Sequence, residues 1–226
     1  MITTARFHIS GKDVEFTPTQ RDFVKRLQNQ KPLTVAVGPA GTGKTLMSCM
    51  VAAKHLMNNH IDKIVITRPT VTVGEDQGYL PGNIDEKMMP WMMPVYDSLS
   101  KVMSQHMLNT LVSDDAIEIC PFSYIRGRTF DNTWVIADEM QNSTPTQMKA
   151  LLTRVGENTR VVVTGDPQQS DLASENGLED LLRHTSLLPA SDEMIDVVVF
   201  GHDDVKRSEF VRFVLEMYDR DHTCSS

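Results

Sequence analysis

The stretch LTVAVGPAGTGKTLMS, residues 33–48, most constrains what this chain can fold into. A short run of apolar and β-branched residues passes into a glycine-rich loop, and a helical pattern begins at Lys44. From Gly38 to Thr45 the loop satisfies G-x-x-x-x-G-K-[ST], a pattern that presents backbone N–H groups to phosphates when a strand precedes it and a helix follows it. The stretch therefore predicts a strand, a phosphate-binding loop and a helix in direct succession.

Each part of this loop has a chemical role in holding a nucleoside triphosphate. The glycines allow N–H groups to turn inward around the phosphates, and the N-terminus of the helix adds its positive dipole. We expect Lys44 to reach the β- and γ-phosphates and Thr45 to bind Mg²⁺ through its hydroxyl. A glycine-rich turn with a solvated lysine is the alternative. The predicted nucleotide-binding residues are Gly38, Pro39, Ala40, Gly41, Thr42, Gly43, Lys44 and Thr45.

Short apolar runs alternate with segments of helical period along the rest of the chain. Six of these runs are predicted to be buried strands: 34–37, 63–67, 116–119, 133–137, 160–164 and 196–200. The predicted helices are 44–57, a segment around 90–107, 145–154, 178–184 and 205–218. This alternation implies right-handed crossovers and a mostly parallel sheet with helices on both faces, so the sequence predicts an α/β fold. We expect residues 1–220 to form one domain and residues 221–226 a flexible tail.

Composition limits the class of protein. With 226 residues and 40% hydrophobic content, the chain is long enough for one compact domain and short for two. It has neither an apolar run of the roughly 18 residues that a membrane span needs nor the apolar segment of a secretory signal, so we expect a soluble, cytoplasmic protein. The three cysteines do not have metal-site spacing. Because the net charge is −8, a nucleic-acid partner would need a local basic patch.

A second motif supplies carboxylates. The segment WVIADEMQN is an apolar strand that ends in Asp138 and Glu139. If this strand neighbours the strand before the glycine loop, its carboxyl end lies beside the phosphates. We assign Asp138 to the metal and Glu139 to the general base that polarises an attacking water. An acidic pair that merely begins a helix is the alternative.

A third motif follows another buried strand. In VVVTGDPQQSDL, the strand ends at Gly165 and is followed by an amide side chain, that of Gln169. We expect Gln169 to contact both a γ-phosphate and the attacking water. It would thereby sense whether the third phosphate is present and change the conformation of the loop that follows. An ordinary Gly-Asp-Pro turn is the alternative.

These motifs together resemble a known family. GPAGTGKT, VIADEMQN and VVVTGDPQQSD, in this order, resemble the three nucleotide motifs of superfamily-1 helicases, and the chain is most similar to the single-domain PhoH-like ATPases. FTPTQRDFVKRL, ITRPTVTVGEDQGYLPG and PFSYIRGRTF also fit that family, and the resemblance covers about residues 15–215. It implies a RecA-like P-loop NTPase fold, Mg²⁺-dependent ATP hydrolysis, and coupling to RNA or single-stranded DNA, including a possible helicase activity.

The resemblance assigns roles to two further side chains. It implies that Gln20 recognises adenine, and a glutamine amide has both the donor and the acceptor for this. Thr17 is a plausible helix cap just before it, so a capping segment without a ligand contact is the alternative. Arg68 follows a predicted strand, and the corresponding region faces nucleic acid in helicase-like relatives. A solvated arginine is the alternative there.

Two arginines in the segment PFSYIRGRTF are candidates for contact with nucleic acid. Arg126 and Arg128 flank a glycine, with Tyr124 and Phe130 close by. Cations interleaved with aromatic rings suit a single-stranded backbone with stacked bases. A salt-bridged turn is the alternative.

Superfamily-1 helicases donate an arginine to the γ-phosphate from a second domain, which we do not expect in a chain of this length. Such an arginine accelerates hydrolysis about a thousandfold or more. We expect Arg207 to supply it, in cis or from a neighbouring subunit, and we expect a hexameric ring in which 71–94 lines the hole or packs against a neighbour. The helix at 205–218 is expected to turn its apolar residues to the sheet, namely Val205, Phe210, Val211, Phe213 and Val214. A solvated Arg207 is the alternative.

Two other functional classes remain as alternatives. A small-molecule kinase would share the glycine loop, but it needs an arginine-rich lid, and the segment TVGEDQGYLPGNIDEKMMP contains one lysine and no arginine. A scaffold that binds nucleotide without turnover would not need Glu139 beside Asp138. The sequence therefore favours an ATPase.

Overall fold

The computed structural model describes residues 7–9, 12–29, 31–69, 93–172, 175–188 and 191–206, together with residues 210, 213 and 217. Most of the segment 71–94, Arg207, most of the predicted helix 205–218 and the predicted tail 221–226 lie outside the described residues.

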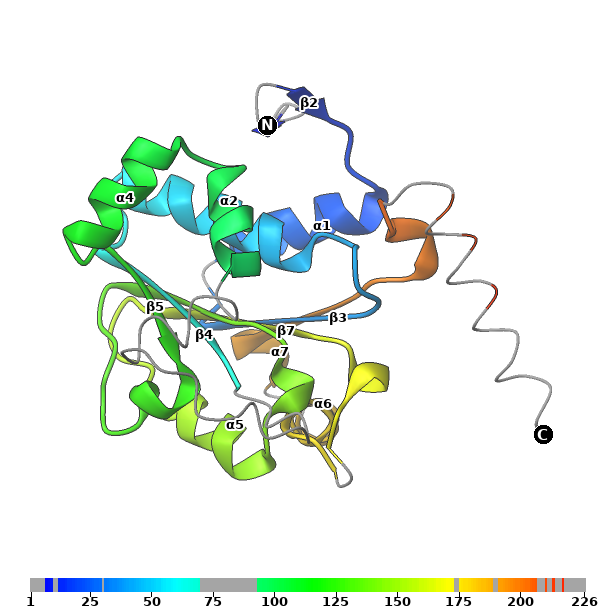
Figure 1. Ribbon diagram of the computed structural model, residues 1–226. Helices are drawn as coiled ribbons and strands as arrows, with labels where there is room; N and C mark the ends of the chain where they lie inside the picture. Colours follow the sequence, from blue (N-terminus) through cyan, green and yellow to red (C-terminus); the bar gives the residue numbers. More distant parts are fainter. Residues whose placement is uncertain are drawn as a thin grey trace, which may run out of the picture.

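The described part of the chain is built on a six-stranded sheet in which every pair of neighbouring strands is parallel (Figure 1). The strand order is β5-β4-β6-β7-β3-β8. In chain order these strands are β3 (Leu33–Val37), β4 (Lys63–Arg68), β5 (Ile117–Pro121), β6 (Thr133–Ala137), β7 (Arg160–Gly165) and β8 (Ile195–Val199). The predicted α/β fold is confirmed. A separate antiparallel pair, β1 (Phe7–Ile9) and β2 (Lys12–Val14), precedes the sheet.

Helices cover both faces of the sheet (Figure 1). One face carries α1 (Pro18–Leu27), α2 (Lys44–Met57), the helical residues 93–100 and α4 (Gln105–Ser113). The other face carries α5 (Pro145–Leu152) and α6 (Gly177–Leu187). The short helix α7 (Ser191–Met194) leads directly into β8.

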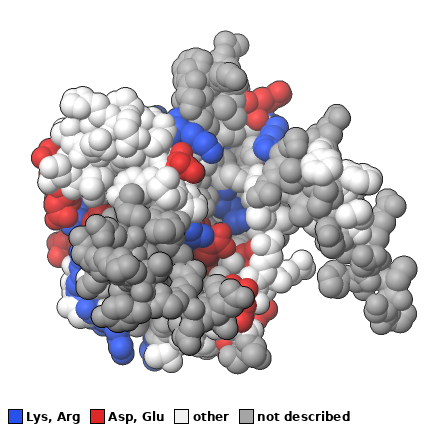
Figure 2. Space-filling view, in the orientation of Figure 1, with Lys and Arg blue, Asp and Glu red and all other residues white. Residues whose placement is uncertain are grey.

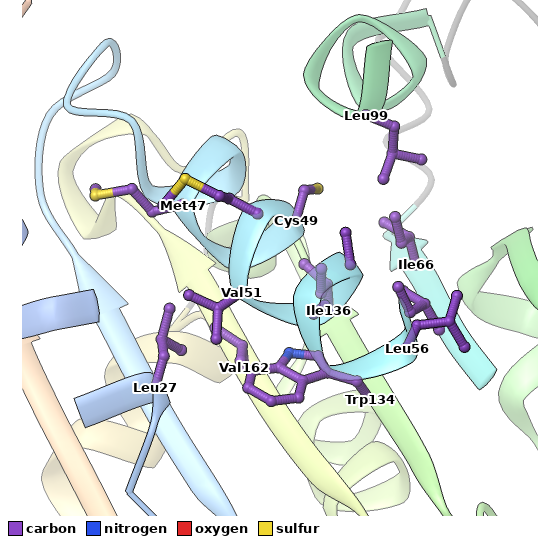
Figure 3. Close-up of a cluster of buried hydrophobic side chains, with 14 of the residues drawn as sticks. Leu27, Met47, Cys49, Val51, Leu56, Ile66, Leu99, Trp134, Ile136 and Val162 are labelled. Atoms are coloured by element: carbon purple, nitrogen blue, oxygen red, sulfur yellow. The ribbon is translucent and has the colours of Figure 1, made fainter. Parts of the chain in front are cut away.

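Two hydrophobic cores result because successive strand residues point to opposite faces. Figure 3 shows part of one core, in which Val51 and Leu56 of α2 lie close to Ile66, Trp134, Ile136 and Val162 of the central strands, and Met47 and Cys49 of α2 belong to the same cluster. The intervening strand residues, such as Val135 and Val163, pack against α5 and α6 on the other side. Both cores contain β-branched side chains that are less than 2% exposed, as expected for parallel strands covered on both faces.

The register of the sheet aligns the carboxyl ends of the central strands. Val37 at the end of β3 is paired with Gly165 at the end of β7, and Ala137 at the end of β6 is paired with Val163. The residues that follow these strands therefore emerge at one edge. This arrangement corrects one expectation: β6, which carries the acidic pair, does not neighbour β3, because β7 lies between them.

The structure corrects two further expectations. The predicted helix around 90–107 is interrupted at 101–104, because Ser104 adopts an extended conformation and its side chain accepts the Met107 N–H, which starts a new helix. Strand β8 is not buried on both faces: it is an edge strand, and Val197 and Val199 are 36% and 68% exposed.

The helix predicted at 205–218 also differs from the expectation where it is described. Val205 is buried, as predicted. Phe210 and Phe213 are expected from the sequence to face the sheet, yet they are 73% and 62% exposed, so the expectation is wrong for these two side chains. In the described residues, no helix combines the length and the apolar character that a membrane crossing requires.

The contrast between central and edge strands can be tested with one substitution at two positions. Val162→Ala in β7 removes methyl groups from a site that is 1% exposed, so we expect the free energy of unfolding to fall by about 2–3 kcal/mol. Val199→Ala in β8 is the matched control, and we expect a change of about 0.5 kcal/mol or less there. Urea unfolding followed by circular dichroism measures both, and equal losses would contradict the assignment of the cores.

Candidate active site

A cavity of about 440 Å³ opens at the carboxyl edge of the sheet. Its walls include the glycine loop, the residues after β6 and β7, and the end of the helical segment 93–100. Basic and acidic side chains gather at the hollow in the middle of the face shown in Figure 2. The predicted residues that line the cavity are Gln20, Ala40, Gly41, Thr42, Gly43, Lys44, Thr45, Asp138, Glu139 and Gln169.

The glycine loop adopts a conformation that requires glycine at two positions. Gly38 has a φ of 138°, and a Cβ atom there would collide with the carbonyl of Phe200. Gly43 has a φ of 84° and immediately precedes α2. Residues with a Cβ atom rarely adopt such φ values, so glycine at these two positions lets the chain turn from β3 into the helix. The residues at the start of α2 line the cavity. The first N–H groups of a helix have no partner within the helix, so this position suits phosphate binding.

Lys44 lies inside this loop and is only 9% exposed. Its Nζ donates hydrogen bonds to the carbonyl oxygens of Gly38 (2.6 Å) and Pro39 (2.9 Å). Burial lowers the pKa of the Lys44 ammonium group, and the negative charges of Asp166, Glu139 and Asp138 oppose that shift. The predicted phosphate ligand is therefore a buried cation surrounded by main-chain carbonyls and three carboxylates.

The two predicted metal ligands are hydrogen-bonded to each other. Oδ1 of Asp138 accepts hydrogen bonds from the hydroxyls of Thr45 (2.8 Å) and Thr164 (2.5 Å). Thr164 belongs to β7 and Thr45 to α2, so Asp138, which follows β6, is bonded to the intervening strand and to the helix after the glycine loop. Asp138 reaches the glycine loop although its strand is not adjacent to β3.

This donor set suits Mg²⁺. Among the described residues, no group of three or more His, Cys, Asp or Glu side chains could hold a metal. Mg²⁺ in phosphate-transfer sites is held by one or two protein oxygens together with phosphate oxygens and waters, so one carboxylate and one hydroxyl are sufficient. Thr45 and Asp138 are the residues that would hold it.

Glu139 is held at its backbone and at both carboxylate oxygens. Its φ is 56°, in the left-handed region that non-glycine residues rarely adopt. Oε1 lies 3.3 Å from Nη2 of Arg68, and Oε2 accepts a 2.7 Å hydrogen bond from Nε2 of Gln141. The Glu139 side chain is 43% exposed and lines the cavity, so a water molecule can reach it.

Arg68 lies against the acidic pair. Besides its contact with Glu139, its Nε is 3.5 Å from Oδ2 of Asp138, and its side chain is only 16% exposed. It is therefore not the solvated arginine that the sequence left open. The sequence places it at the correct edge of the sheet but does not reveal its partners, because β4 and β6 are neighbours only in the folded sheet.

The residues that follow β7 form a tight turn beside the cavity. Asp166 caps the short 3-10 helix η3 (Pro167–Gln169) by accepting the N–H of Gln168 at 3.1 Å. Gln169 lines the same cavity as Lys44 and the acidic pair. Asp166, Ser98, Lys101 and Lys206 also line the cavity, and sequence reasoning missed them. In the sequence, the aspartate of Gly-Asp-Pro indicates only turn chemistry.

Gln20 closes one side of the cavity and is almost completely buried. Thr17 caps α1 as predicted, and Oε1 of Gln20 accepts the N–H of Thr17, which forms a capping box that was not predicted from the sequence. Nε2 of Gln20 donates to the carbonyls of Thr42 (3.0 Å) and Asp204 (3.3 Å). The N–H of Lys206 donates to the carbonyl of Gly41 at 3.2 Å. The start of α1 and the segment 204–206 therefore brace the glycine loop through its backbone.

The basic loop lies outside this cavity, and its two arginines differ. Arg128 forms a two-pronged contact with Glu118 (2.6 and 2.8 Å) and stacks over Phe130 at 4.9 Å. Its hydrogen bonds lower the pKa of Glu118 to about 2, with a further contribution from Lys63. Arg128 is thus held in the salt-bridged turn that the sequence left open as the alternative. Arg126 is exposed, and Tyr124 near it is 52% exposed.

Relatives of the chain match it over most of its length. The sequence matches the family described as PhoH-like protein over residues 14–219. The PhoH-like protein of Bacillus subtilis (strain 168) is 39% identical over 211 residues, which cover 93% of this chain and 65% of that protein. Protein PhoH of Escherichia coli (strain K12) is 41% identical over 203 residues, 88% of this chain and 56% of that protein. The chain thus spans less than two thirds of the length of these relatives.

Solved structures share the fold at low sequence identity. The large terminase of a thermophilic bacteriophage has a TM-score of 0.58 at 11% identity and covers 92% of this chain and 50% of that chain. The UvsW helicase of bacteriophage T4 has a TM-score of 0.54 at 13% identity, with 87% and 64% covered. The family match covers nearly the whole described region, and the glycine loop and acidic pair lie at one cavity. The chain therefore belongs to the PhoH-like protein family and has the fold of a RecA-like P-loop ATPase.

Proposed function

We propose that this protein hydrolyses ATP with the help of Mg²⁺. The observation that carries the proposal is the convergence of Lys44, Thr45, Asp138 and Glu139 on one cavity. The large terminase of the thermophilic bacteriophage, which shares the fold, has also been solved in complex with ADP. An adenine nucleotide is consistent with this and with the family resemblance of the segment around Gln20.

The proposed reaction divides between the residues already described. Lys44 and the N–H groups of the glycine loop bind the β- and γ-phosphates. Thr45 and Asp138 would hold Mg²⁺, which would supply positive charge to neutralise the phosphate oxygens. Glu139 accepts a proton from the attacking water as its oxygen bonds to the γ-phosphorus. The bond from that phosphorus to the bridging oxygen breaks, and ADP and inorganic phosphate leave. Gln169 contacts the γ-phosphate and the water.

Glu139→Gln and Lys44→Ala should have different kinetic effects. Glu139→Gln should lower kcat about 100-fold or more while ATP still binds, because only the proton acceptor is lost. Lys44→Ala should also weaken ATP binding, because a phosphate ligand is lost. Glu157→Gln, an exposed residue outside the cavity, is the control and should be unaffected. Steady-state ATPase assays and ATP titrations measure both quantities. Wild-type turnover in Glu139→Gln would contradict the proposed base.

Coupling to RNA or single-stranded DNA is the second part of the proposal. UvsW, which shares the fold, is a helicase. The net charge of −8 requires a local cationic contact, and the exposed Arg126 beside the exposed Tyr124 offers a cation next to a stacking surface. Arg128 stabilises the same loop through its ion pair with Glu118 on β5. We therefore assign direct contact to Arg126 and a supporting role to Arg128, and Arg68 acts within the acid cluster.

Single-stranded RNA or DNA should stimulate ATP turnover. Arg126→Ala should weaken binding of the nucleic acid several-fold. It should also reduce the slope of log affinity against log salt concentration by about one, because one phosphate contact is lost. Arg183→Ala, an exposed arginine on α6, is the matched control. ATPase assays and fluorescence anisotropy at several salt concentrations provide the readouts. Turnover that neither nucleic acid changes would contradict the coupling and favour a scaffold role or a protein client.

Arg207 remains our proposed arginine for the γ-phosphate, supplied in trans within a hexameric ring. Arg207→Ala should lower kcat about 1,000-fold. Mixing Arg207→Ala with Glu139→Gln subunits should restore part of the activity, because an intact arginine from one subunit would complete the intact site of the other. Light scattering with ATP and Mg²⁺ should report six subunits. A monomer with full turnover would rule out the trans arrangement, and mixtures without recovery would point to action in cis.

A further inference from the structure

A buried amide, that of Gln141, connects Glu139 to the end of β7. Gln141 lies in the 3-10 helix η2 (Met140–Asn142) and is 2% exposed. Its Nε2 donates to Oε2 of Glu139 at 2.7 Å, and its Oε1 accepts the N–H of Asp166 at 3.1 Å. We propose that Gln141 is a positioning residue that holds the carboxylate of Glu139 in its catalytic orientation and fixes it to the loop after β7. This inference rests on the proposed role of Glu139 as the base.

The two contacts require the chemistry of an amide. A carboxylate oxygen needs a donor, and a backbone N–H needs an acceptor, so the connecting side chain must offer one of each. A glutamate at 141 would still accept the Asp166 N–H, but it would turn a second acceptor toward Glu139. An asparagine is shorter by one methylene group. The hydrogen bonds to Glu139 and Asp166 therefore require glutamine at position 141.

The surroundings leave Gln141 little freedom to move. A Cβ atom at Gly165 would lie 2.5 Å from Oε1 of Gln141, so the amide packs directly on the backbone of β7. The Gln141 carbonyl accepts a 2.9 Å hydrogen bond from the hydroxyl of Ser170. The Asp171 N–H donates to the side chain of Asn142 at 3.0 Å. Several hydrogen bonds thus connect residues 141–142 to the segment 165–171. This second segment contains Gln169.

Hydrogen bonds, rather than packing, set the orientation of the Glu139 carboxylate. The side chain is 43% exposed and projects into the cavity, so close packing does not fix its rotamer. Arg68 contacts one carboxylate oxygen at 3.3 Å, and Gln141 contacts the other at the shorter distance of 2.7 Å. Loss of the Gln141 contact would leave the carboxylate free to rotate away from the attacking water, and such misplacement lowers the rate of the chemical step.

The inference predicts an effect on kcat without an effect on nucleotide affinity. Among the described residues, Gln141 is not part of the cavity wall. Gln141→Leu should lower kcat about 10-fold to 100-fold, the range typical of residues that orient a reactive group, and should leave the Kd for ATP within about twofold. Gln105→Leu is the matched control, because Gln105 also connects a donor and an acceptor through its amide but lies exposed on α4. It should retain wild-type kcat.

A double variant separates positioning from a general effect on structure. If Gln141 acts through Glu139, adding Gln141→Leu to Glu139→Gln should lower the residual single-turnover rate by less than about twofold. Gln141→Met keeps the length of the side chain and introduces no buried charge, so it provides a folded variant if Gln141→Leu does not fold. It should show the same loss of kcat as Gln141→Leu.

The possible outcomes distinguish this inference from the proposed function. Wild-type turnover in Glu139→Gln would remove the base and the inference together. An inactive Glu139→Gln with a fully active Gln141→Leu would overturn the inference alone. A raised Kd with unchanged kcat in Gln141→Leu, or an equal loss of rate in both backgrounds, would also overturn it. A loss of kcat that disappears in the Glu139→Gln background would support it.

Discussion

The carboxylate of Asp138 contacts side chains from three elements around the candidate nucleotide site. It is 4% exposed, and burial of a charged group is costly unless hydrogen bonds or an opposite charge compensate. The Thr45 hydroxyl of α2, the Thr164 hydroxyl of β7 and the guanidinium of Arg68 on β4 provide this compensation. The position of the glycine loop relative to the acidic pair depends on this cluster, because β6 and β3 do not touch each other in the sheet.

Much of the fold could be predicted from periodicity alone. Six apolar strands alternating with helical segments imply a parallel sheet, and the glycine loop with its two neighbouring elements was located to within a residue. Strand order could not be predicted in the same way, since a crossover can skip one strand or none, and the insertion of β7 between β3 and β6 is a property of the whole sheet. The exposure of β8 was missed for a related reason: edge and central strands can have equally apolar sequences.

The position of a candidate site residue was predictable where a motif or a strand end fixes it, and its partners were missed where they lie far away in the sequence. Lys44, Thr45, Asp138 and Glu139 could be assigned because loop pattern and strand ends fix their positions. Gln141 follows the acidic pair by two residues, and its importance depends on Asp166, a residue 25 positions away. The side chains of Arg68 and Arg128 similarly meet carboxylates from other strands, so their sequence context showed positive charge without showing its partners.

The left-handed backbone at Glu139 sets a limit on how stable this domain can become. A φ of 56° costs a side chain with a Cβ of the order of 1 kcal/mol relative to glycine, and the surrounding contacts must hold it there. Selection for heat resistance alone would favour glycine or asparagine at this position. With Glu139 as the proposed base, glutamate in this conformation represents a compromise between the stability of the fold and turnover, at one residue after a central strand.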